Sequence, residues 1–218
     1  MIEALILFAV LGIFAGLIAG MFGVGGGIIT VPVLVACFIQ YGFEEAIMIQ
    51  MAVGTSLGCI VFTGISSAYA HRQKNAINYS FFKPIALGIV VGAFLGALFA
   101  VQLNGNILKI IIGIFALFVA IQMSFNREIE FKERTKKNKE PYFVGTGIGF
   151  TSSILGIGGG IFSVPYLKAS GLSMTSSIGT SAACGIPIAI FGTLGYIISG
   201  VNNALLPPLT LGYIYLPA

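Results

Sequence analysis

Two stretches of this sequence decide its fold: GMFGVGGGIITVPVL, from Gly20 to Leu34, and SILGIGGGIFSVPYL, from Ser153 to Leu167. Each stretch places three consecutive glycines and then Val-Pro inside an apolar run. Glycine raises the entropic cost of a helix and permits positive φ angles, and proline removes a main-chain donor. We therefore predict that a helix breaks at each stretch and that a new half-helix starts near Ile28 and near Ile161.

The composition indicates an integral membrane protein. Hydrophobic residues make up 57% of the 218 residues and charged residues only 8%, whereas about a quarter of an average soluble domain is charged. Six of the eleven Lys and Arg residues fall within 127–139, so the net charge of +4 marks a solvated loop and not a nucleic-acid surface. The three cysteines form no C-x-x-C pair, and we expect neither a metal nor another cofactor. The expected fold class is all-α, a polytopic helical membrane protein with discontinuous helices.

Apolar run lengths and loop charges predict the topology. A spanning helix needs ~20 mostly apolar residues, and four runs are long enough: 46–70, 80–101, 107–125 and 175–199. The runs 28–40 and 160–169 are too short and are predicted to be half-helices or re-entrant pieces. Because basic loops stay on the cytoplasmic side, we expect 71–79 and 126–140 to be cytoplasmic, and 40–45 and 102–106 to be external. The predicted location is the cell (inner) membrane.

The sequence also contains an internal duplication. An offset of 133 residues pairs Gly23-Val24-Gly25-Gly26-Gly27 with Gly156-Ile157-Gly158-Gly159-Gly160, and Val31-Pro32 with Val164-Pro165. Gly54-Thr55-Ser56 matches Gly179-Thr180-Ser181 after a deletion of eight residues. We divide the chain into a first repeat, 1–125, a charged loop, 126–140, and a second repeat, 141–218. Whether the repeats run parallel or inverted stays open at this point.

The doubled pattern G-x-G-G-G-x-x-x-V-P followed by G-T-S resembles the sulfite exporter TauE/SafE family of membrane transporters. The resemblance covers essentially the whole chain, and it implies transport of sulfite, organosulfonates or related sulfur-containing anions. The second repeat is shorter than the first and ends in LPPLTLGYIYLPA, which is expected to be the start of a helix. The chain therefore reads as a member without its C-terminal spans. The alternatives are a non-transporting scaffold or partner subunit, or an inactive fragment.

The glycine breaks are the predicted substrate site. The start of a half-helix exposes free N–H groups and a positive dipole end, so it can hold an anion without a cationic side chain. The hydroxyls of the G-T-S motifs could donate to the same anion, although bonding to the i−4 carbonyl of their own helix is equally expected. The expected substrate-binding residues are Gly25, Gly26, Gly27, Thr55, Ser56, Gly158, Gly159, Gly160, Thr180 and Ser181.

Other features favour structural roles. Gly88-x-x-x-Gly92-x-x-x-Gly96 is typical of close helix packing, and Cys59 and Cys184 are expected to be small buried side chains. The only histidine, His71, sits with basic residues at a helix end, where positive charge suits the helix dipole. Without an embedded acid–base pair an enzyme is disfavoured. The expected partners are the lipid bilayer and a small sulfur-containing anion, with no nucleic acid, and homo-oligomerisation is left open.

Overall fold

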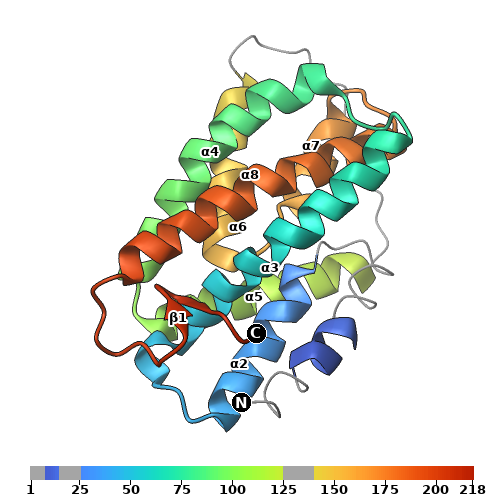
Figure 1. Ribbon diagram of the computed structural model, residues 1–218. Helices are drawn as coiled ribbons and strands as arrows, with labels where there is room; N and C mark the ends of the chain where they lie inside the picture. Colours follow the sequence, from blue (N-terminus) through green and yellow to red (C-terminus); the bar gives the residue numbers. More distant parts are fainter. Residues whose placement is uncertain (1–7, 15–25, 125–139) are drawn as a thin grey trace.

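The computed structural model describes residues 8–14, 26–124 and 140–218 (Figure 1). Residues 8–14 are helical. The remaining elements are α2 Gly27–Gln40, α3 Glu45–Gln73, α4 Tyr79–Gln102, α5 Gly105–Ser124, α6 Glu140–Leu155, α7 Gly160–Ala169, α8 Met174–Gly200, β1 Thr210–Leu211 and β2 Ile214–Tyr215. The described part is mostly helical, and its only strands are the two-residue β1 and β2, which confirms the predicted fold class.

Four of the described helices are long and apolar enough to cross a membrane, and they are the four that the sequence predicted: α3, α4, α5 and α8. The helices α2 and α7 have 14 and 10 residues. At 1.5 Å per residue, α7 is about 15 Å long, half the thickness of the ~30 Å hydrocarbon core of a bilayer. Both are therefore half-helices, as predicted.

The centre of the molecule is formed by α3, α4, α6 and α8 (Figure 1). Helices α3 and α8 run antiparallel, since Gly54 near the start of α3 lies against Tyr196 near the end of α8, and Gly64 lies against Ile186. Buried polar side chains, among them Ser56 and Ser181, line the same interior as the apolar core. This interior holds the candidate site.

Glycines bring α4 and α6 into main-chain contact. A Cβ atom added to Gly88, Gly92 or Gly96 would overlap a carbonyl oxygen of α6, and Gly145 and Gly149 of α6 approach α4 in the same way. Residues further along α4 contact residues further along α6, so the two helices are parallel. The structure thus supports the predicted packing role of the 88–96 glycines. A second run with the same spacing, Gly12-x-x-x-Gly16-x-x-x-Gly20, for which we also expect a packing role, lies mostly outside the described residues.

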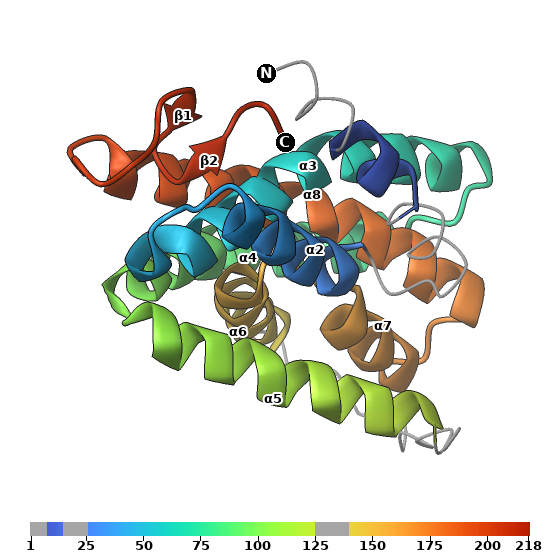
Figure 2. The same cartoon turned by 90° about the horizontal axis from the view of Figure 1, so that it is seen from below.

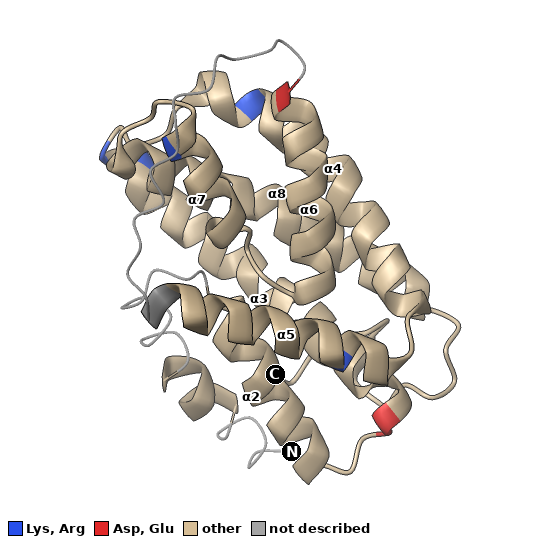
Figure 3. Ribbon diagram, turned by 180° about the vertical axis from the view of Figure 1, so that it is seen from behind, with Lys and Arg blue, Asp and Glu red and all other residues tan. Residues whose placement is uncertain are grey.

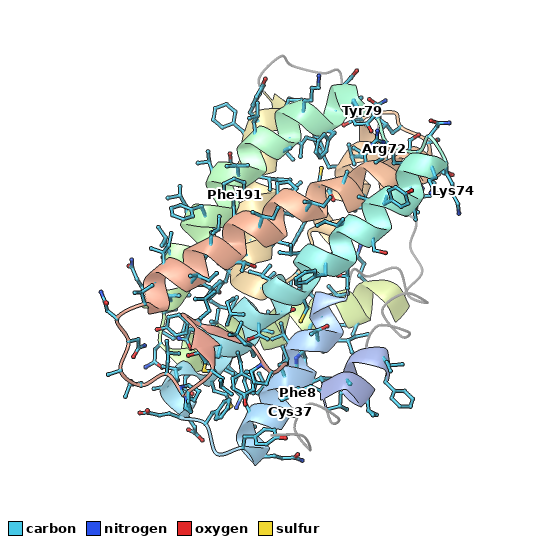
Figure 4. The ribbon with its side chains drawn as sticks, viewed as in Figure 1. Phe8, Cys37, Arg72, Lys74, Tyr79 and Phe191 are labelled. Atoms are coloured by element: carbon cyan, nitrogen blue, oxygen red, sulfur yellow. The ribbon has the colours of Figure 1, made fainter. Side chains whose placement is uncertain are left out.

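Charged residues gather at the two ends of the helices (Figure 3). Gly105 lies against the carbonyl of Glu45, and Gln50 donates a 2.9 Å hydrogen bond to the carbonyl of Leu103. The loops before α3 and before α5 therefore share one end. At the opposite end lie Arg72 and Lys74, near Tyr79 at the start of α4 (Figure 4). The expected pairing of 40–45 with 102–106 is therefore found at one end, and 71–79 lies at the other, whereas the loop 126–140 lies, except for Glu140, outside the described residues.

The half-helices α2 and α7 run in opposite directions. Each starts in the interior; α2 leads to the end that carries the start of α3, and α7 leads to the end that carries the start of α8 (Figure 1). Since α3 and α8 are also antiparallel, the matching elements are related as in inverted repeats. Helix α5 lies along the outside, beside α6 and α7 (Figure 2), and most of its long apolar side chains are exposed, as expected for contact with lipid.

The end of the chain differs from the prediction. The stretch LPPLTLGYIYLPA was expected to begin a helix, but it forms turns and the antiparallel pair of β1 with β2, in which Thr210 is opposite Tyr215. Two consecutive prolines, Pro207 and Pro208, and the positive-φ residues Leu209 and Gly212 oppose a helix here. The segment folds back onto α8, where Gly212 packs against Ile197 and Gly200, and onto α3, where the carbonyl of Tyr213 lies against Gly54.

Candidate functional site

The two half-helices begin where the glycine runs end. Gly26 precedes α2 with a φ of 66°, and Gly159 precedes α7 with a φ of 76°. These left-handed angles favour glycine over any residue with a Cβ atom. In the second repeat, residues 156–159 separate α6 from α7. The predicted helix starts are confirmed to within one residue. Gly25, a predicted site residue, lies outside the described residues.

The glycine stretches of the two repeats touch each other. A Cβ atom on Gly27 would overlap the main-chain oxygen of Gly156 and lie 2.7 Å from the Cα atom of Ile157. Gly156 has a φ of 71°, and its own missing side chain makes room for Val31 of α2 and Val53 of α3. The first turn of α2 thus rests directly on the main chain that leads into α7.

In each half-helix, a hydroxyl of the first turn donates a hydrogen bond to the carbonyl of the glycine that precedes the helix. Thr30 donates a 3.0 Å hydrogen bond to the carbonyl of Gly26, and Ser163 donates a 2.8 Å bond to the carbonyl of Gly159. The two residues are 133 positions apart, so they occupy equivalent places in the repeats. We had not predicted either residue, although the offset that aligns the glycines also aligns these hydroxyls.

The serines of the G-T-S motifs hold the second glycine stretch. Ser56 donates a 2.9 Å hydrogen bond to the carbonyl of Gly156. The Oγ atom of Ser181 lies 2.6 Å from the Oγ atom of Ser163, and both side chains are buried. The predicted residues Ser56 and Ser181 therefore lie beside the break between α6 and α7.

The threonines of the same motifs face other segments. Thr55 accepts a 3.0 Å hydrogen bond from the N–H of Tyr215, and Thr180 accepts a 2.9 Å bond from the N–H of Asn78. The glycines that precede the two threonines contact the same two segments: Gly54 lies against the carbonyl of Tyr213, and Gly179 lies against the carbonyl of Ala76. Each threonine thus anchors the chain that follows the long helix of the other repeat.

The remaining predicted glycines lie next to α8. The main-chain oxygen of Gly158 is 3.2 Å from the position of a Cβ atom on Gly185, and a Cβ atom on Gly160 would lie 3.9 Å from the Oγ atom of Ser181. Of the predicted set, the structure brings together Gly27, Ser56, Gly158, Gly159, Gly160 and Ser181, and it places Thr55 and Thr180 apart from the break. A Cβ atom on Gly26 would have no described atom within 4 Å.

The break between α6 and α7 lies at the middle of the long helices. Gly159 packs against Ile188, which is close to the midpoint of the 27-residue helix α8. Every described Lys, Arg, Asp and Glu residue lies instead in a connection or near the end of a helix (Figure 3). The described surroundings of the break therefore offer main-chain N–H groups and hydroxyls, and no charged side chain. Such a set can bind an anion through hydrogen-bond donors and a helix dipole.

Of the two cysteines expected to be buried, only Cys184 is so. Cys184 is fully buried in the core, and Cys59 is partly exposed. Cys37 lies near Phe8 at the end opposite Arg72 and Lys74 (Figure 4). His71 is in the last turn of α3 together with Arg72.

The fold and this centre define a class: a polytopic membrane protein whose half-helices begin at glycines in its interior, the construction of secondary transporters. Residues 8–216 match the sulfite exporter TauE/SafE family, and the chain belongs to that family.

Similar proteins carry a consistent description. A "Probable membrane transporter protein" of Haemophilus influenzae is 37% identical over 221 residues, covering 100% of this chain and 83% of that protein. A second protein so described, from Methanocaldococcus jannaschii, is 29% identical over 97% of this chain and 78% of its own length. A third, from Bacillus subtilis, is 28% identical over 91% of this chain and 80% of its own length. No solved structure matches the chain. The protein is thus a multi-pass member of a membrane transporter family.

Proposed function

We propose that this protein exports small sulfur-containing anions, such as sulfite or an organosulfonate, and that the anion binds where the half-helices start. The observation that carries the proposal is the contact of Gly27 with Gly156 and Ile157, which brings the start of α2 onto the chain leading into α7. Membership of the sulfite exporter TauE/SafE family supports the substrate class.

The chemistry of the site favours an oxyanion over a cation. The first N–H groups of a helix have no partner within it, and the helix dipole places partial positive charge at the same point. Gly159 and Gly160 carry no side chain that would keep an anion away from this main chain. A cation would require carbonyl or carboxylate oxygens, but the nearby carbonyls of Gly156 and Gly159 already accept hydrogen bonds from Ser56 and Ser163.

The membrane potential favours export. An inside-negative potential drives an anion outward by ~2.3 kcal/mol per charge per 100 mV. Proton-coupled carriers usually place a carboxylate or histidine inside the membrane, and the described interior has neither at the break. The anion therefore moves alone or carries its own proton.

Flux through proteoliposomes tests the proposal. The full-length protein is reconstituted, the vesicles are loaded with sulfite or methanesulfonate, and a potassium–valinomycin potential is imposed. A potential that is negative inside should accelerate efflux of an anion that moves alone, whereas dependence on pH alone would indicate movement with a proton. Flux of a cation without flux of either sulfur anion would overturn the proposal. Absence of any flux would favour the scaffold alternative.

A further inference from the structure

Ser152 in the last turn of α6 carries a hydroxyl that has no hydrogen-bond partner within the described part of the chain. Its side chain is fully buried, and its Oγ atom forms no hydrogen bond with any described residue. The main-chain oxygen of Ser152 accepts a hydrogen bond from the N–H of Ile157, which fixes the residue at the point where α6 ends. An unpaired buried hydroxyl costs about 1–3 kcal/mol, so its persistence requires an explanation.

The hydroxyl faces the start of α7. The Oγ atom of Ser152 lies 3.3 Å from the position that a Cβ atom on Gly159 would occupy, and the other nearest atoms to that position belong to the side chains of Ile148 and Ile188. Gly159 is the residue that precedes α7, and α7 has ten residues. Among the described residues, none accepts a hydrogen bond from the N–H of Gly160 or Ile161. A free O–H group and two free N–H groups therefore occur at one helix start.

The hydrogens of the neighbouring serine hydroxyls already take part in hydrogen bonds. Ser163 donates its single hydrogen to the carbonyl of Gly159, so the hydrogen in the 2.6 Å contact between Ser163 and Ser181 comes from Ser181. Ser56 donates to the carbonyl of Gly156. Of the serine hydroxyls around this break, Ser152 is the one that can still donate.

We propose that Ser152 is a substrate-binding residue that donates its hydroxyl hydrogen, together with the N–H groups of Gly160 and Ile161, to a small oxyanion. The inference rests on the proposed function and adds to it a ligand that the sequence pattern did not single out. The offset of 133 pairs Ser152 with Ala19, so the first repeat has no hydroxyl at the matching position. The two halves are then unequal, and the second half supplies the stronger set of donors.

The test compares Ser152→Ala with Ser177→Ala. Ser177 is a matched control because it is also a fully buried serine whose hydroxyl has no hydrogen-bond partner among the described residues, and it lies in α8 one turn nearer than Ser181 to the start of that helix. Methanesulfonate flux is measured against concentration in proteoliposomes. Loss of one hydrogen bond to a charged ligand should raise the half-saturating concentration about tenfold in Ser152→Ala. Ser177→Ala should match the unchanged protein.

Melting temperatures measured with and without methanesulfonate distinguish a loss of substrate binding from a loss of stability. Removing an unpaired hydroxyl relieves a desolvation penalty, so the melting temperature of Ser152→Ala without anion should equal or exceed that of the unchanged protein. Methanesulfonate should raise the melting temperature of the unchanged protein but not that of Ser152→Ala. Unchanged half-saturation together with an unchanged increase in melting temperature would overturn the role of Ser152. If the unchanged protein moves no sulfur anion, the proposed function itself fails.

A second variant covers the case in which Ser152→Ala does not fold. Ser152→Cys is nearly isosteric and is made after Cys37, Cys59 and Cys184 are replaced by alanine. Methanesulfonate should slow its alkylation by N-ethylmaleimide and leave the alkylation of Ser177→Cys unchanged. Equal rates with and without methanesulfonate at position 152 would contradict the proposal.

Discussion

Ser56 on α3 donates a hydrogen bond of 2.9 Å to the main-chain carbonyl of Gly156, a residue 100 positions further along the chain. The bond is buried and links the long helix of the first repeat to the glycine break of the second. Because Gly156 also touches Gly27, this hydrogen bond helps to hold the start of α2 against the break between α6 and α7.

Replacing Ser56 by alanine should destabilise the protein. The carbonyl of Gly156 would lose its donor in a buried place, at a cost of about 1–3 kcal/mol. The free energy of unfolding is measured in detergent with increasing denaturant. Ser66→Ala is the control, because Ser66 is exposed on the same helix. Equal stability of the two variants would show that Ser56 does not hold the break.

Gly92→Ala should destabilise the protein, although alanine is the better helix former. A Cβ atom at position 92 would overlap the carbonyl oxygen of Thr146 in α6, and such overpacking typically costs about 1–3 kcal/mol. Gly113→Ala in α5 meets no described atom within 4 Å and should gain up to about 1 kcal/mol from helix propensity. The melting temperature should therefore fall in Gly92→Ala and rise in Gly113→Ala. A higher melting temperature of Gly92→Ala would contradict the close packing of α4 and α6.

Gly26→Leu and Gly159→Leu should abolish anion flux and leave membrane insertion intact, since leucine blocks close approach to the main chain. Gly171→Leu is the control: Gly171 also has a positive φ, of 87°, but it lies in the turn between α7 and α8, at the far end of α7 from Gly159. Backbone strain of about 1–2 kcal/mol is then common to all three variants. Normal transport by Gly159→Leu would make the glycine-site hypothesis wrong.

Single cysteines should report the topology. In a protein without its native cysteines, Gln73→Cys at the end of α3 should be reached by a membrane-impermeant thiol reagent from the cytoplasmic side, and Gln102→Cys at the end of α4 from outside. Both positions are exposed. Labelling of both cysteines from the same side of intact cells would contradict the topology derived from the loop charges.

Thr55→Val should loosen the end of the chain. The N–H of Tyr215 would lose its acceptor, Thr55 Oγ1, so hydrogen exchange of the Tyr215 amide should accelerate. Thr180→Val should act instead on the amide of Asn78, which is bonded to Thr180. Each variant is the control for the other. If both variants accelerated hydrogen exchange at both amides, the two threonines would not be separate anchors.

Local residue chemistry determined much of this fold. The apolar runs predicted α3, α4, α5 and α8, and the glycines before Ile28 and Ile161 predicted the starts of α2 and α7. These features depend on residues within a few positions of one another, since hydrophobic length and φ preference are local properties. The family resemblance was equally readable, because it rests on a short motif that occurs twice.

The tertiary structure alone decided which groups meet. Ser56 and Thr55 are adjacent in the sequence, yet one bonds Gly156 and the other bonds Tyr215, because neighbouring residues on a helix point about 100° apart. Ser152 has no sequence signal, since its significance lies in the absence of a partner beside Gly159. The two prolines before Leu209 already oppose a helix at the end of the chain, but the position of the β1–β2 hairpin is fixed by its contacts with α3 and α8, which are distant in the chain.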